Sequence, residues 1–168
     1  MLSAKLLSAL NDQINYEFES AHIYLAMASY CASEDLNGFE NFFIVQAEEE
    51  RFHAMKFYNY VNEMDGRVTL TSMGNPQNEF ESILAAFEET LIHEKSVTER
   101  IYNLMDLATE EREHATISVL KWFIDEQVEE EATAKTIIKK LKMLKDNPHG
   151  IFMLDQELAG RVFTPPTV

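Results

Sequence analysis

Glycine and proline are scarce in this chain and are concentrated in two places. Of the 5 Gly and 4 Pro residues, most fall between residues 66 and 76 or after residue 147. Because both residue types interrupt helices, the long stretches without them favour long helices. The 168 residues are also enough to bury a sizeable core, so we expect a single domain over residues 1–168.

Apolar residues recur at the spacing of an α-helix in four long segments. These predicted helices cover residues 3–33, 38–64, 80–108 and 110–145. The link over residues 66–79 has 14 residues and can extend over roughly 46 Å, whereas the second helix is about 40 Å long. The link can therefore cross the whole bundle, which leaves the second and third helices parallel. An antiparallel pair, a long crossover and a second antiparallel pair make an all-α, ferritin-like four-helix bundle.

The residues that flank the fourth helix suggest where it begins and ends. We expect Thr109 to be its N-cap, because acidic residues then follow at the positive end of the helix dipole. Pro148 and Gly150 are expected to stop it. Residues 150–160 then form a short fifth helix, which must pack against the bundle because it is too short to be stable alone.

Acidic residues outnumber basic ones by a wide margin. The 29 Asp and Glu against 14 Lys and Arg give a formal charge of −15. Such a surface repels phosphate backbones, so we expect no nucleic-acid partner, whereas a cation suits it. Cys31 is the single cysteine, which excludes a disulfide within the chain and a cysteine-rich metal cluster. The N-terminal MLSAKLLSAL is too short for a signal or membrane span, so we expect a cytoplasmic protein without a membrane partner.

Several polar residues fall inside the apolar stripes of the predicted helices. At 100° per residue, Glu50 and His53 of the stretch EEERFHAM lie in the middle of the second helix's stripe. The corresponding residues of the other three helices are Glu17, Glu94 and Gln127. Glu130 and Glu131 lie on either side of the fourth stripe, and the spacing leaves open which of them faces inward. All these residues lie near the middle of their helices, and so at one level of a four-helix core.

Buried carboxylates at this level need a positive charge. Burying several of them costs many kcal/mol unless they share protons or bind a cation, and no Lys or Arg lies in the stripes. A metal is the simpler answer, and oxygen ligands with one imidazole favour iron or manganese over structural zinc. Glutamates on neighbouring helices can bridge two such ions. The imidazole is expected from His53. The other histidines lie on the surface, at a flank or in a loop: His22, His114, His93 and His149.

The chain resembles the bacterial non-haem ferritins over essentially its whole length. The resemblance runs through LLSALNDQINYEFESAHIYLAM, EEERFHAMKFYNYV, HEK and WFIDEQVEEE. The residues at the spacing of that family's ferroxidase centre are Glu17, Tyr24, Glu50, His53, Glu94, Gln127 and Glu130. The resemblance implies iron storage, oxidation of Fe(II) by O2 or H2O2 at two irons in each subunit, and a shell of 24 subunits around a ferric mineral.

The same resemblance implies a role for each residue. The implied ligands of the first iron are Glu17, Glu50 and His53. Those of the second iron are Glu50 as a bridge, Glu94 and, rather than its neighbour at 131, Glu130. Gln127 would lie beside the irons, and Tyr24 just outside their ligands as a possible electron donor. A third iron site nearer the inner surface would use Glu49, Glu126, Glu129 and the shared Glu130.

Related families share the bundle but differ in their motifs. Bacterioferritins carry a second Glu-x-x-His, where this chain has Gln127 and Glu130, and a haem-binding Met where it has Phe52, so we expect no haem. Rubrerythrin-type peroxidases add a Cys-x-x-Cys module, which a single cysteine excludes. The mini-ferritins that coat DNA build their iron site between subunits and often have a basic tail, and neither feature matches this chain. In a different class, a helical bundle that only binds a partner would leave the buried carboxylates unexplained.

Overall fold

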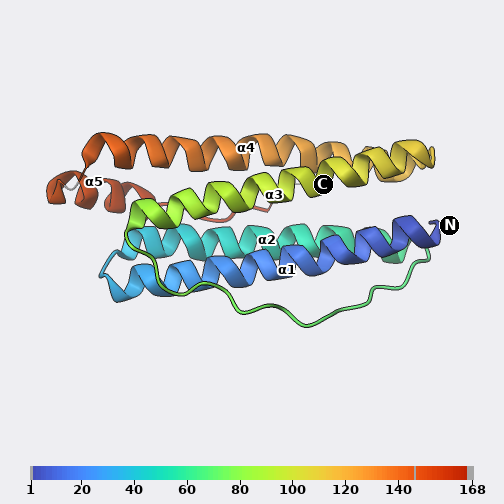
Figure 1. Cartoon of the computed structure of the whole chain (residues 1–168), viewed down its shortest axis with the longest axis horizontal. Coiled ribbons are helices and arrows are strands. Elements are labelled where there is room, and N and C mark those ends of the chain that lie inside the picture. The colour runs from blue at the N-terminus through green and yellow to red at the C-terminus, as the bar shows by residue number, and fades with distance from the viewer. Residues whose placement is uncertain (1, 146, 166–168) are drawn as a thin grey trace.

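The chain folds into a bundle of four long helices with a short fifth helix at one end (Figure 1). The computed structural model describes residues 2–145 and 147–165, and this part contains five helices and no strand. The helices are α1 (Ala4–Ser33), α2 (Asn37–Glu63), α3 (Ile83–Glu110), α4 (His114–Leu144) and α5 (Pro148–Leu158). The predicted fold class and helix order are confirmed. The single domain expected over residues 1–168 also includes residues 1, 146 and 166–168, which lie outside the described part.

The long crossover between α2 and α3 is fixed to α1 by two asparagines. The Asn11 amide donates to the Arg67 carbonyl oxygen at 3.1 Å and accepts from the Thr69 backbone N–H at 2.6 Å. Asn15 repeats the pattern one turn later, with the Thr69 carbonyl oxygen at 2.9 Å and the Thr71 N–H at 2.8 Å. The crossover thus runs back along the whole bundle, and α2 and α3 are parallel, as predicted (Figure 1).

Several helix ends differ from the prediction. Pro148 and Gly150 were expected to stop the fourth helix, but α4 already ends at Leu144 and both residues lie inside α5, which covers Pro148–Leu158 rather than residues 150–160. α3 begins at Ile83, three residues after the predicted start, because the Ser82 hydroxyl caps it by accepting a hydrogen bond from the Ala85 N–H at 3.1 Å. The predicted N-cap Thr109 is wrong, because α3 continues past it and α4 begins only after Glu113. The Glu113 carboxylate accepts a hydrogen bond from the Thr116 N–H at 2.7 Å, and this charged acceptor caps α4 in place of a hydroxyl.

The fifth helix packs on the start of α2 and completes its N-terminus. Asp155 is buried, and its Oδ1 accepts hydrogen bonds from the backbone N–H groups of Gly38 at 2.7 Å and Phe39 at 3.0 Å. Leu36, at the N-cap position of α2, offers no side-chain cap, so Asp155 satisfies donors that the helix leaves free. Glycine permits this contact, since a Cβ on Gly38 would lie 1.7 Å from the Asp155 carbonyl oxygen.

The interior of the bundle contains two apolar clusters with a polar layer between them. One cluster adjoins α5 and includes Phe43 and Phe87. The other lies toward the start of α1 and includes Phe57 and Phe123, whose rings are stacked. The buried polar residues of the layer are Glu17, Gln46, Glu50, His53, Glu94, Gln127 and Glu130. The apolar clusters therefore hold the helices together on both sides of the buried carboxylates.

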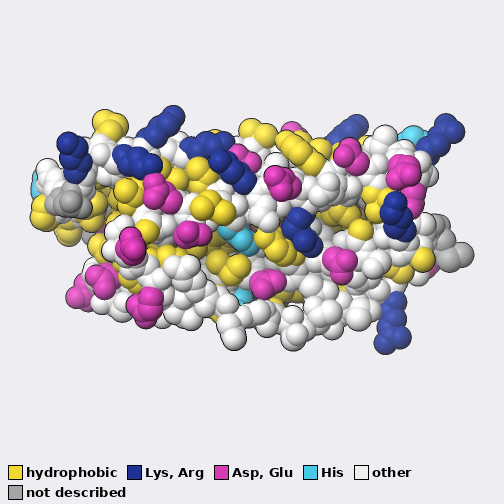
Figure 2. Space-filling view, viewed as in Figure 1, with side chains coloured by type: hydrophobic (Ala, Val, Ile, Leu, Met, Phe, Trp, Pro, Cys, Tyr) yellow, Lys and Arg dark blue, Asp and Glu magenta, His cyan; other side chains and the backbone are white. Residues whose placement is uncertain are grey.

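Charges of both signs cover the outer surface (Figure 2). On the face shown, most Lys and Arg side chains lie over α3 and α4, whereas acidic side chains are spread over both helix pairs. The excess of acidic residues is therefore not gathered into one patch on this face. None of the described helices combines the length and the apolar character that a membrane crossing requires.

Candidate metal centre

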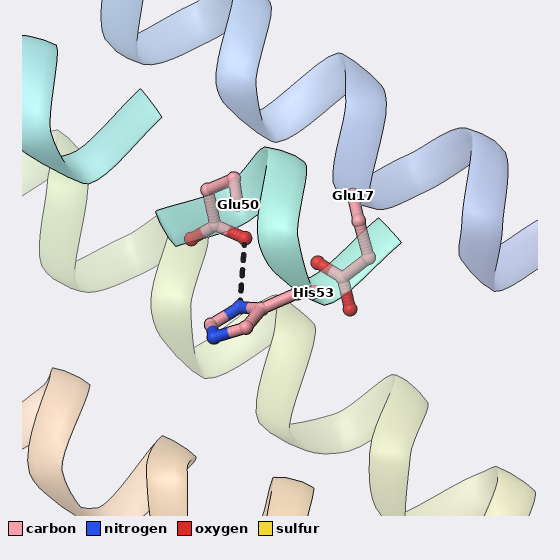
Figure 3. Close-up of side chains that lie close together, drawn as sticks. All are labelled: Glu17, Glu50 and His53. Atoms are coloured by element: carbon pink, nitrogen blue, oxygen red, sulfur yellow. Dashed lines mark hydrogen bonds and ion pairs between the residues drawn. The ribbon is translucent and has the colours of Figure 1, made fainter. Parts of the chain in front are cut away.

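Three side chains of the first helix pair converge in the polar layer (Figure 3). Glu17 comes from α1, Glu50 and His53 come from α2, and all three are buried. One potential ligand atom from each residue lies within 4.8 Å of the others. Carboxylate oxygens and an imidazole nitrogen are metal ligands, so this group can hold a metal ion between α1 and α2.

The local sequence of α2 aims its two polar residues inward. Glu50 and His53 are three residues apart and so share one face of the helix, with His53 Nδ1 3.3 Å from Glu50 Oε2 (Figure 3). One turn further along the same face, Phe57 is fully buried in an apolar cluster, and Phe43 is fully buried on the other side. These phenylalanines fix the rotation of α2, and the helix in turn fixes where the carboxylate and imidazole point.

The second helix pair adds Glu94 and Gln127 to the layer. One carboxylate oxygen of Glu94 accepts a hydrogen bond from the Tyr24 hydroxyl, and the other accepts from Gln127 Nε2 at 3.1 Å. Gln127 also donates to the Glu94 carbonyl oxygen at 3.1 Å. Tyr24 on α1 and Gln127 on α4 thus each hold one oxygen of the Glu94 carboxylate.

The structure separates Glu130 from Glu131. Glu130 is buried, and its Oε2 accepts a hydrogen bond from Gln46 Nε2 at 2.6 Å. Glu131 is only partly buried, pairs with Lys135 at 2.7 Å, and accepts from the Thr98 hydroxyl at 2.9 Å. Glu130 therefore belongs to the polar layer, whereas the charge of Glu131 is already compensated at its rim.

Burial shifts the pKa of every glutamate in the layer upward. It raises the pKa of Glu17 to about 7. Burial, reinforced by repulsion from Glu94, raises the pKa of Glu50 and of Glu130 well above the usual range, and burial also raises the pKa of Glu94 itself. Burial lowers the pKa of His53 to about 4, so its imidazole is neutral at pH 7. A cation competes with protons for such carboxylates, and the neutral imidazole can act as a ligand without losing a proton first.

One oxygen of Glu17 has no hydrogen-bond partner. Its Oε1 accepts from Gln13 Nε2 at 2.8 Å, and Gln13 Oε1 in turn accepts from Arg100 Nε at 3.0 Å. The sequence analysis missed this link, because Arg100 lies outside the α3 stripe and reaches Glu17 only through an amide. Within residues 2–145 and 147–165, Glu17 Oε2 is the buried side-chain oxygen left without a donor. Such an oxygen fits a site built around a cation.

The residues expected at a third iron site lie just outside the polar layer. Glu49 and Glu126 are partly buried, and Glu129 is exposed. Glu126 Oε2 lies 4.0 Å from His53 Nε2, and Glu49 Oε2 lies 2.5 Å from Arg161 Nη2. The three glutamates therefore lead from the layer toward the surface between α2 and α4, and one of them has a basic partner that the sequence analysis did not anticipate.

His93 is more enclosed than a surface residue. Its Nε2 lies 2.8 Å from the Ser20 hydroxyl, and its ring stacks on Tyr16 at 5.5 Å and meets Tyr24 edge-on at 5.8 Å. Burial lowers the pKa of His93 to about 4. His93 directly precedes Glu94 on α3, but its side chain packs against α1 and does not join the carboxylates. The two tyrosines, two turns apart on α1, are the signal in the sequence for a planar partner.

Comparison with known proteins places the chain near one family. Residues 7–144 match the model of the ferritin-like domain family. The bacterial non-heme ferritin of Staphylococcus aureus (strain MRSA252) is 47% identical over 163 residues, which cover 97% of this chain and 98% of that protein. The bacterial non-heme ferritin of Staphylococcus saprophyticus is 48% identical over the same shares.

Solved structures agree with the sequence relatives. A closed form of the Archaeoglobus fulgidus ferritin, engineered by site-directed mutagenesis, superposes with a TM-score of 0.96 at 46% identity, over 98% of this chain and 100% of that one. The open-pore ferritin of the same archaeon gives a TM-score of 0.95 at 45% identity, over 96% and 98%. The chain therefore belongs to the ferritin family of iron-binding, iron-storage proteins.

Proposed function

We propose that this protein oxidises Fe(II) in the polar layer of each subunit and stores the ferric product as a mineral. The observation that carries the proposal is a set of buried carboxylates from all four helices in which one oxygen, Glu17 Oε2, has no donor. A bound cation removes much of the cost of burying these charges. Iron is the substrate that the ligand types favour, because hard oxygen ligands with an imidazole accommodate both of its oxidation states.

The layer offers positions for two iron ions. The first position takes Glu17, Glu50 and His53, whose potential ligand atoms lie close together. The second takes Glu94 and Glu130 from the other helix pair, with Glu50 as the bridge. Because both helix pairs contribute ligands, the two ions lie side by side between them, as in other carboxylate-bridged bundles.

Two adjacent Fe(II) ions can each give one electron to the oxidant. With two protons, the two electrons convert O2 to H2O2, or H2O2 to water. Gln127 and Tyr24 keep the Glu94 carboxylate in place through their hydrogen bonds during this change of charge. Tyr24 contacts a proposed iron ligand directly, so it is positioned to donate a further electron.

Storage requires that the ferric product leave the layer. We assign Glu49, Glu126 and Glu129, together with Glu130, to a third iron site on this path. The mineral is then enclosed by a shell of 24 copies of the chain in the cytoplasm. Family membership supports the assembly, and the formal charge of −15 supports the attraction of Fe(II) to the protein.

Removing the shared carboxylate tests the proposal. In the Glu50→Ala variant, we expect the oxidation rate of the first Fe(II) ions to fall at least about 100-fold, because a direct ligand matters more than residues that only support ligands. The rate is measured from the absorbance of the ferric product. The control is Glu131→Gln, which removes a carboxylate already paired with Lys135 beside the layer and should keep the wild-type rate. Wild-type rates in both variants would contradict the proposal.

A further inference from the structure

The chain after α5 turns back along the bundle and lies against α2 (Figure 1). Asn41 of α2 holds this tail by donating hydrogen bonds to the carbonyl oxygens of Leu158 at 3.1 Å and Arg161 at 2.9 Å. Further along, the ring of Phe163 packs against Phe52 with 5.9 Å between their centroids. The tail is therefore anchored on both sides of the Arg161 side chain.

Arg161 reaches from the tail onto three residues of α2. Its Nη2 lies 2.5 Å from Glu49 Oε2, and its Nη1 donates to Gln46 Oε1 at 2.8 Å. The guanidinium also lies over the Phe42 ring, 4.3 Å from the centroid. The Arg161 side chain is 24% exposed and that of Glu49 is 22% exposed, so water screens this charge pair less than it screens a surface pair.

Gln46 connects Arg161 to the polar layer through two hydrogen bonds. Its amide oxygen accepts from Arg161, and its Nε2 donates to Glu130 Oε2 at 2.6 Å. Because an amide has one accepting and one donating end, Arg161 decides which end of Gln46 faces Glu130. Arg161 thus contacts one carboxylate of the proposed third site and also orients a residue bonded to the second iron position.

We propose that Arg161 is a tethered counter-ion that a metal ion must displace from Glu49 to occupy the third site, and that this displacement weakens the attachment of the tail to α2. The inference rests on the proposed function, because Glu49 binds iron only if iron passes there. A guanidinium stays protonated near neutral pH and competes with a metal for the same carboxylate oxygen. Its attachment to the tail keeps its local concentration high. The third site is thereby weaker than the two positions in the layer, which suits a site of passage.

The test is Zn2+ binding to the assembled, metal-free protein, because Zn2+ is not oxidised and requires no turnover. Calorimetry separates the tight sites of the layer from a weaker site. Arg161→Ala is expected to tighten the weaker site about tenfold and to leave the tight sites unchanged. The matched control is Lys140→Ala. Lys140 lines the same groove as Arg161, but its Nζ pairs with Glu157 at 2.6 Å, so losing its charge should change Zn2+ binding little.

A second background isolates the contact with Glu49. In Glu49→Gln, which keeps the size of the side chain, adding Arg161→Ala is expected to produce no further change in Zn2+ binding. A tenfold effect that persists in this background would overturn the proposal, because it would then not arise from the Glu49 carboxylate. An unchanged weaker site in Arg161→Ala alone would overturn it as well.

The weaker attachment of the tail provides a readout on the unaltered chain. Zn2+ at the weaker site is expected to speed chymotryptic cleavage after Phe163, followed by mass spectrometry, and Arg161→Ala should be cleaved fast without Zn2+. Cleavage that Zn2+ does not affect would contradict displacement. A wild-type protein without tight Zn2+ sites would instead refute the proposed function. Tight sites together with an unaffected Arg161→Ala variant would refute only the role of Arg161.

Discussion

His53 and Phe57 lie one turn apart on α2 and face the same interior, but they act on the fold in opposite ways. Phe57 is fully buried and stacks on Phe123, with 3.9 Å between centroids and an interplanar angle of 9°. His53 is 3% exposed, contacts the same Phe123 edge-on with 5.8 Å between ring centroids, and has Nδ1 3.3 Å from the Glu50 carboxylate. Burying a phenyl ring stabilises the fold, whereas burying an imidazole and a carboxylate costs free energy.

The contrast shows how the bundle separates stability from function. The apolar clusters on both sides of the polar layer fix the spacing and rotation of the four helices. The carboxylates are therefore held close together although they repel one another, which prepares the layer for a cation. Changes in the clusters and changes in the layer should consequently have opposite effects on the metal-free protein.

The largest change in stability is expected in an apolar cluster. Phe57→Ala should lower the free energy of unfolding of the metal-free protein by about 3–5 kcal/mol, because it removes a buried ring and leaves a cavity beside Phe123. Thermal unfolding at fixed protein concentration measures the loss. Ile92→Ala is the control, since Ile92 is 61% exposed and should change stability by less than about 0.5 kcal/mol. Equal effects of the two substitutions would remove the basis of the comparison.

The opposite sign is expected in the polar layer. Replacing Glu50 and His53 together by leucine should raise the free energy of unfolding of the metal-free protein by about 1–4 kcal/mol, because similar volumes fill the space without buried charge. The same variant should assemble normally and fail to oxidise Fe(II). A less stable variant would mean that these polar contacts hold the bundle together by themselves.

The polar layer should also make the stability of the metal-free protein depend on pH. The pKa of Glu17 is about 7 in the fold against 4.5 unfolded, so the folded state binds more protons between these values and its stability falls as pH rises. His53 acts in the other direction, because its pKa is about 4 in the fold against 6.5 unfolded, and its contribution to stability is lost as pH falls.

The two contributions oppose each other below about pH 6.5, where the pKa shifts of Glu17 and His53 overlap. His93, whose pKa is also lowered from 6.5 to about 4, acts in the same direction as His53, and both contributions fade as pH rises past 6.5. The glutamates then dominate, since the pKa values of Glu50 and Glu130 are raised well above the usual range. The melting temperature of the metal-free protein should therefore fall from pH 6.5 to 8, and Glu17→Gln should lessen the fall. A melting temperature that rises over this range would show that the carboxylates are not destabilised by burial.

The smallest effect is expected far from the layer, where α5 caps α2. Asp155→Asn keeps the shape of the side chain but removes the negative charge that accepts from Gly38 and Phe39 at the start of α2. We expect a loss of about 1 kcal/mol in the free energy of unfolding, with no change in Fe(II) oxidation. A slower oxidation rate in this variant would show that the end of the bundle influences the polar layer.

Helical periodicity was sufficient to place the central residues. Glu17, Glu50 and His53 lie among apolar residues spaced at three and four positions, and such residues fix which face of a helix is buried. The structure buries all three. Periodicity could not choose between Glu130 and Glu131, because neighbouring positions lie 100° apart on either side of the stripe. Their different partners, Gln46 and Lys135, come from the packing and from the adjacent turn.

The links from arginines to the layer were beyond the reach of sequence patterns. Arg100 acts through Gln13 of another helix, and Arg161 acts through Gln46 from the tail. Long side chains that cross between elements depend on tertiary distances, which periodicity does not contain. The helix boundary was misplaced at Thr109 because the N-cap is Glu113, whose carboxylate accepts a hydrogen bond from the Thr116 N–H.

The most direct test of the account is to add Fe(II) in large excess in air, separate the protein by size, and measure the iron retained per chain. The account predicts far more than about two irons per chain, in a particle many times the mass of one chain, because the layer oxidises iron that then leaves for storage. Retention of only about two irons per chain would mean that the layer binds and oxidises iron without storing it, and the storage function would be contradicted.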